Sequence, residues 1–226
     1  MKQTMFAKVR RRLYRHPVLV MILFGMVYLV CFNLLERIPR QIHLVECALD
    51  AYIPFVSSAI IPYVAWFAWV PAVLFYLIYT DRTRFWRGFS AMVGGIVVTL
   101  ILYTVWPTGL NLRGAVPDTG LCNELVRMIY QMDTPTNVCP SLHVFVTVVL
   151  LCTLWGKLGM TGRILNGTLA VAICCSTVLL DQHSIIDVVM GLALAVLMWY
   201  VTRWTRYGRK ERQTEFYTVK VKMVES

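Results

Sequence analysis

Six long apolar runs dominate this chain and restrict what it can fold into. They cover residues 17–35, 59–79, 89–106, 142–155, 164–180 and 188–202. A helix needs roughly 20 mostly apolar residues to cross the hydrocarbon core of a bilayer, and several runs approach that length. With 58% hydrophobic and 15% charged residues, the chain is also too apolar for an ordinary soluble domain. We therefore predict an all-α integral membrane bundle of six transmembrane helices.

Basic residues gather at alternate ends of these runs. If the chain crosses six times, eighteen of its 22 Lys and Arg residues fall on one side, in the tails 1–16 and 203–226 and the loops 80–88 and 156–163. Cytoplasmic loops of membrane proteins are enriched in Lys and Arg. The pattern predicts a multi-pass cell-membrane protein with both termini in the cytoplasm. Residues 1–226 then form one membrane domain, in which basic tails flank a six-helix core at 17–202.

The net charge of +10 has two readings. A strongly basic chain is sometimes a nucleic-acid binder, but here the basic residues stand in short flanks of the apolar runs. Attraction to anionic lipid explains that placement more simply. We therefore expect the membrane bilayer, and not nucleic acid, as the partner of these charges; the oligomeric state stays open.

Two segments on the side opposite the basic loops interrupt the apolar pattern. The first, 36–55, mixes apolar and charged residues and predicts a short amphipathic helix along the membrane interface. The second, 106–140, is rich in Pro, Gly and Asn and predicts a long functional loop. Three cysteines on this side leave one disulfide open as a possibility: Cys47, Cys122 and Cys139.

A histidine stands at the start of the fourth run, in the stretch NVCPSLHVF. Alone, His143 would more often be a structural residue than a functional one. Pro140, however, suits the first turn of a helix, so we expect the fourth helix to begin here. The free N–H groups around Ser141 and His143 would then face the outer side, where a helix start favours an anion.

A second polar group stands at the start of the sixth run. His183 and Asp187 are four residues apart, which places both on one face of a helix. A carboxylate that accepts a hydrogen bond from one imidazole nitrogen leaves the other free to act as a nucleophile. The same pair can also serve only for packing. Arg113 and Arg127, the basic residues of the long loop, offer planar guanidinium groups to a phosphate.

With these residues in place, the chain resembles the type 2 phosphatidate phosphatase superfamily of membrane lipid phosphatases, which shares a six-helix bundle and three motifs. The second family motif reads Pro-Ser-Gly-His, and the third reads Ser-Arg, five residues, His, three residues, Asp. The stretches CPSLH and STVLLDQHSIID supply the matching positions, which are Pro140, Ser141, His143, Ser176, His183 and Asp187. The resemblance begins at about the second run.

The chain also departs from the family pattern. Leu142 replaces the glycine of the second motif, and Thr177 replaces the arginine of the third. The first motif reads Lys, six residues, Arg, Pro; Arg113 fits its arginine, but Trp106 and Gly114 stand where Lys and Pro would be. The pattern is more similar to a divergent branch that includes inositol phosphorylceramide synthase and sphingomyelin synthase relatives.

The resemblance implies a lipid phosphatase that uses no metal and no cofactor. His183 would attack the phosphorus of a lipid phosphate, assisted by Asp187, and His143 would protonate the leaving alcohol. Arg113 and Ser141, with Arg127 as a competitor, would bind the phosphate. The substrate class would be phosphatidate, phosphatidylglycerophosphate or a polyprenyl diphosphate, at the non-cytoplasmic face. Two alternatives remain: transfer of a phospho-headgroup between lipids, and a non-catalytic membrane protein.

Overall fold

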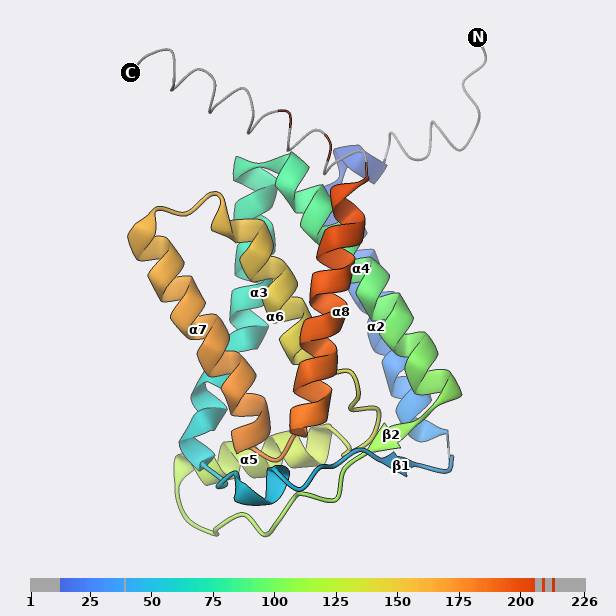
Figure 1. Ribbon diagram of the computed structural model, residues 1–226, viewed down its shortest axis with the longest axis vertical. Helices are drawn as coiled ribbons and strands as arrows, with labels where there is room; N and C mark the ends of the chain where they lie inside the picture. The colour runs from blue at the N-terminus through green and yellow to red at the C-terminus, as the bar shows by residue number, and fades with distance from the viewer. Residues whose placement is uncertain (1–12, 39, 206–208, 210–212, 214–226) are drawn as a thin grey trace.

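Six long helices lie side by side in one bundle in the computed structural model (Figure 1), which describes residues 13–38, 40–205, 209 and 213. Most of the two basic tails, 1–16 and 203–226, lies outside the described residues, including most of their Lys and Arg residues. Each bundle helix contains most of one apolar run of the sequence. The helices are α2 (Pro17–Arg37), α3 (Ile60–Thr80), α4 (Arg82–Val105), α6 (Leu142–Trp155), α7 (Met160–Leu179) and α8 (Ile185–Arg203).

Five of these helices, within the part of the chain described, are long and apolar enough to cross a membrane; α6 is the shorter exception. Its 14 residues rise only about 21 Å, less than the hydrocarbon thickness of a bilayer. However, α6 packs against α3, α4, α7 and α8 and is largely buried among them, so it does not face lipid as the others do. The all-α membrane bundle is confirmed, while the count of six crossings stays a prediction.

The chain connections separate the two ends of the bundle. The segments 40–59, 106–141 and 180–184 all lie at the lower end in Figure 1, together with the cap formed by α5. The short connections after α3 and α6, the start of α2 and the end of α8 lie at the upper end. The residues singled out in the sequence therefore gather at one end. Which side of the membrane that end faces stays a prediction.

Three of the helix starts are fixed by side chains that accept hydrogen bonds from backbone N–H groups. Asp81 caps α4 by accepting hydrogen bonds from the N–H groups of Thr83 and Arg84. Ser141 caps α6, and Ser184 caps α8. Such caps satisfy N–H groups that have no partner within the helix.

The segment 36–55 does not form the predicted amphipathic α-helix. It contains the strand β1 (His43–Leu44) and one 3₁₀ turn, η1 (Asp50–Tyr52); a further turn, η2 (Ser57–Ala59), precedes α3. β1 pairs in parallel with β2 (Thr108–Gly109) from the second outer segment. Because these backbone groups bond across to another segment, they are not free for a helix.

The segment 106–140 holds a helix that the sequence reading treated as loop. This helix, α5 (Leu121–Met132), lies across the lower end of the bundle (Figure 1). Its apolar face packs with Val126 against Ile60, Tyr63 and Leu180 at the ends of α3 and α7. The outer segments therefore form a structured cap over the bundle.

Candidate functional site

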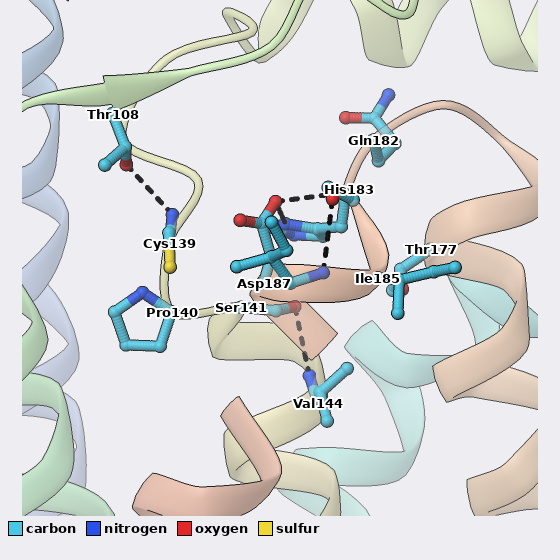
Figure 2. Close-up of polar contacts among 12 residues, drawn as sticks. Thr108, Cys139, Pro140, Ser141, Val144, Thr177, Gln182, His183, Ile185 and Asp187 are labelled. Carbon is cyan, nitrogen blue, oxygen red and sulfur yellow. Dashed lines mark hydrogen bonds and ion pairs between the residues drawn. The ribbon is translucent and has the colours of Figure 1, made fainter. Parts of the chain in front are cut away.

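The start of α8 holds the first half of the site. His183 Nδ1 lies 3.3 Å from Asp187 Oδ2, and the same oxygen accepts the Ser184 N–H at 3.0 Å. Figure 2 shows the two side chains turned toward each other at the first turn of α8. Asp187 is fully buried, and the His183 side chain is 11% exposed. With Nδ1 on the carboxylate, the Nε2 atom of His183 is the one left for a substrate.

The short connection before α8 holds His183 from the other side. The N–H groups of Gln182 and His183 both donate to the Thr177 carbonyl oxygen, at 3.0 and 3.1 Å. Thr177 stands in the last turns of α7, where the family pattern has an arginine. Its backbone, and not its side chain, therefore contributes to the site by fixing the chain on which His183 stands.

The start of α6 is joined directly to α8. The Ser141 N–H donates to the Asp187 carbonyl oxygen at 3.0 Å, and the Ser141 hydroxyl accepts from the Val144 N–H at 3.4 Å. Just upstream, the Cys139 N–H donates to Thr108 Oγ1 (Figure 2). The Ser141 N–H therefore has a partner within the protein. Its hydroxyl accepts one hydrogen bond, so the O–H proton can still donate to a phosphate.

His143 follows in the first turn of α6 and is surrounded by rings from α3. Its imidazole stacks on Tyr63, with centroids 4.5 Å apart, and lies 4.4 Å from the Trp66 ring and 5.8 Å from the Phe67 ring. The centroids of His143 and His183 are 6.3 Å apart. His143 Nε2 and Trp66 Nε1 are buried without a hydrogen-bond partner. This aromatic surround could not be predicted from the sequence, because it depends on how α3 packs against α6.

Arg113 lies at the same end of the bundle as the two histidines and contacts Gln182, the residue before His183. Its Nη2 donates to Gln182 Oε1 at 2.6 Å and its Nη1 to the Asp133 carbonyl oxygen at 2.7 Å. The guanidinium lies over the Tyr130 ring, 4.5 Å from its centroid. Burial lowers the pKa of Arg113, against the opposing effect of Asp133. Its Nε atom is buried and has no hydrogen-bond partner in the protein.

Arg127 is not brought to this place. Its guanidinium donates to the carbonyl oxygens of Pro117 and Asp118, on the loop that precedes α5. Those hydrogen bonds stabilise the loop and do not involve the histidines. Of the two arginines considered in the sequence, only Arg113 contacts a neighbour of His183.

Two site residues were missed in the sequence. Gln182 bridges Arg113 to the chain beside His183, and its position next to the histidine was the available signal. Asp133 lies where α5 ends; burial, with a further contribution from Glu36, raises the pKa of Asp133 to about 6, although Arg113 and His183 oppose the shift. The protonation state of a carboxyl group with this pKa depends on the charges of the groups around it.

The cysteines and possible metal ligands add no further centre. All seven cysteines are free, including the three considered for a disulfide. In the part of the chain that the structure describes, no three His, Cys, Asp or Glu side chains gather as metal ligands would.

Comparison with known proteins bears on the same region. The family model of the PAP2 superfamily matches residues 116–211, from just before α5 to beyond α8. That stretch contains His143, His183 and Asp187, while Arg113 lies just before it. No curated protein and no solved structure gives a significant match.

Proposed function

We propose that this chain, a member of the PAP2 superfamily, hydrolyses a lipid phosphate through a phosphohistidine intermediate. Members of this superfamily are generally phosphatases, which supports an enzyme. The observation that carries the finer proposal is the pair of imidazoles, one hydrogen-bonded to a buried carboxylate and the other 6.3 Å away between ring centroids. Both rings are close enough for one phosphoryl group to contact them together.

In the first step, His183 Nε2 attacks phosphorus, so that an N–P bond forms and the P–O bond to the lipid alcohol breaks. His143 gives its proton to the leaving oxygen. Asp187 holds the Nδ1–H of His183 and stabilises the positive charge that develops on the ring, as a carboxylate does for a catalytic imidazole. The 3.3 Å contact and the full burial of Asp187 support this role.

In the second step, a water molecule gives a proton to His143 and attacks phosphorus from the side opposite His183. The new O–P bond forms, the N–P bond breaks, and inorganic phosphate leaves. Both histidines then return to their starting protonation states. Arg113 supports both steps by stabilising charge on the phosphoryl oxygens, since guanidinium–phosphate hydrogen bonds are among the stronger ones in proteins.

The position of the site favours a lipid substrate. It lies at one end of a bundle of apolar helices, and the ends of helices that cross a bilayer lie near the lipid headgroups. A phosphatidate, a phosphatidylglycerophosphate or a polyprenyl diphosphate presents its phosphate there. The distribution of Lys and Arg supports the non-cytoplasmic side of the cell membrane for this end.

The direct test measures inorganic phosphate released by the detergent-solubilised protein from a panel of lipid phosphates. We expect His183→Ala and His143→Ala each to lower kcat by at least about 100-fold, the range of positioned acid–base catalysis. His43→Ala is the matched control, because His43 lies on the exposed strand β1 against Trp106 and contacts neither imidazole. Wild-type rates in both of the first two variants would refute the proposal.

Headgroup transfer is the second candidate, and the small number of cations at the site favours it. Arg113 contacts Gln182, whereas Thr177 and Trp106 hold positions at which the family pattern has Arg and Lys. Fewer cations suit a phosphodiester, which carries one negative charge, better than a phosphomonoester, which carries two near neutral pH. An acceptor alcohol would then replace water in the second step. A labelled lipid with and without acceptor separates the two, as free phosphate or as a new phosphodiester lipid.

A further inference from the structure

Asp50, in the outer segment between α2 and α3, makes a set of hydrogen bonds that none of the sequence motifs includes. Its Oδ1 accepts the Ile185 N–H at 2.9 Å, and its Oδ2 accepts the Ser184 hydroxyl at 2.7 Å and the Cys47 N–H at 2.8 Å. The residue is 8% exposed. One carboxylate thus joins a segment near the first span to the start of the last helix.

These contacts make Asp50 a helix cap supplied from a distant part of the chain. The first N–H groups of a helix have no partner inside it and carry the positive end of the helix dipole, so a carboxylate is favourable there. Burial raises the pKa of Asp50, but hydrogen bonds from Ile185, Cys47 and Ser184 outweigh that effect, and the net shift is downward. The carboxylate is therefore charged at neutral pH.

The cap acts on the residue next to His183. Ser184 donates its hydroxyl to Asp50 and its N–H to Asp187 Oδ2, while its hydroxyl oxygen accepts the Ile186 N–H at 3.1 Å. Every polar group of the Ser184 side chain is thereby used. Because Thr177 holds the N–H of His183 from the other side, the short connection before α8 is fixed at both ends.

We propose that Asp50 is a positioning residue for His183: by fixing Ser184, it keeps the imidazole on the carboxylate of Asp187 and turns its free nitrogen toward the substrate. This inference rests on the proposed function of His183 as nucleophile. It assigns a role to the outer segment 38–56, which lies outside the stretch that matches the family.

Asp50→Asn is the main variant. The carboxylate has two acceptor oxygens, whereas an amide has one oxygen and an N–H₂ group that cannot accept. At least one of the three donors to Asp50 therefore loses its acceptor. We expect kcat to fall about 10- to 100-fold with little change in KM, because a small displacement of a nucleophile costs rate more than binding. Asp50→Glu, which keeps two acceptor oxygens, restores part of the rate.

Glu46→Gln is the matched control. Glu46 lies in the same segment, and its carboxylate also bonds across to another segment, the Asn111 N–H, but it does not contact α8. This variant should keep the wild-type kcat. A double variant of Asp50→Asn with Ser184→Ala should be no slower than the slower single variant, because both changes break one pathway. Wild-type kcat in Asp50→Asn, or a fall in thermal stability alone, overturns the inference.

A second measurement keeps this inference separate from the proposed function. Diethyl pyrocarbonate acylates imidazole, and peptide mass spectrometry gives the rate at His183 without any substrate. We expect Asp50→Asn and Asp187→Asn to change that rate in the same direction, with Glu46→Gln unchanged. If Asp50→Asn keeps the wild-type rate while Asp187→Asn does not, Asp50 does not position His183. Loss of the proposed function alone would leave these rates unaffected.

Discussion

At the scale of single residues, the two imidazoles of the site have different surroundings. His183 is hydrogen-bonded to a buried carboxylate, whereas His143 is enclosed by the rings of Tyr63 and Trp66. The buried carboxylate gives the first imidazole a hydrogen-bond partner, while the Nε2 atom of the second has none in the protein. This difference suits His183 as a nucleophile whose ring becomes positive during reaction, and leaves His143 Nε2 unoccupied by the protein.

Substitutions of the two arginines of the outer segment should have different effects in the phosphate-release assay. Arg113→Ala removes hydrogen bonds next to His183, so we expect kcat/KM to fall about 10- to 100-fold, the usual effect of losing a charged hydrogen bond. Arg113→Lys should restore only part of it, since an ammonium does not bridge Gln182 and Asp133 as the planar fork does. Arg127→Ala should stay near wild type; the reverse order would place the phosphate on Arg127 instead.

At the scale of elements, the contact between α6 and α8 sets the distance between the histidines. Gly191 in α8 lies against the start of α6, and a Cβ there would come within 2.7 Å of the Ser141 carbonyl oxygen. Because that oxygen belongs to the backbone, it has little room to move. The hydrogen bond from the Ser141 N–H to the Asp187 carbonyl depends on the same close approach.

Gly191→Ala should therefore lower both stability and activity. We expect a loss of about 1–3 kcal/mol in unfolding free energy, typical of overpacking in a tight interior, together with a reduced kcat. Gly25→Ala in α2 is the control, since a Cβ at that position meets no atom within 4 Å. Thermal unfolding in detergent and phosphate release from the same samples measure both effects. Equal melting temperatures for the two variants would contradict this account of the α6–α8 contact.

The elements also show which structural features the sequence could predict. Hydrophobic runs predicted the bundle helices because burial in lipid or protein needs only apolar side chains. The spacing of His183 and Asp187 predicted their contact, since it depends on one helix alone. The pairing of β1 with β2, the surround of His143 by α3 and the cap from Asp50 join segments far apart in the chain, and no local pattern encodes them. Helix α5 had a local signal, an apolar face at helical spacing, that the Pro and Gly around it obscured.

At the scale of the whole molecule, the bundle has two chemically different ends. One end carries the histidines under a cap of outer segments, and the other carries the short connections with Asp81, Arg84 and Lys157. The largely buried α6 carries His143 toward the capped end from inside the bundle. The five longer helices supply the surface that meets lipid, where large apolar side chains remain exposed.

The orientation of this bundle can be measured with cysteines placed at its two ends. In a variant without native cysteines, Met128→Cys puts an exposed thiol on α5, and Met160→Cys puts one at the start of α7 on the other end. A maleimide that does not cross membranes should label the first in intact cells and the second only after permeabilisation. The opposite labelling would place the histidines on the cytoplasmic side.

The central claim is that His183 carries the phosphoryl group during reaction. Rapid quenching of the protein with a lipid labelled in its phosphate, followed by peptide mapping under alkaline conditions that preserve phosphohistidine, measures this directly. The account predicts label on the peptide that contains His183, lost in His183→Asn and reduced in Asp187→Asn. Phosphate release at the wild-type rate with no label on His183, or with label on another residue, would contradict it.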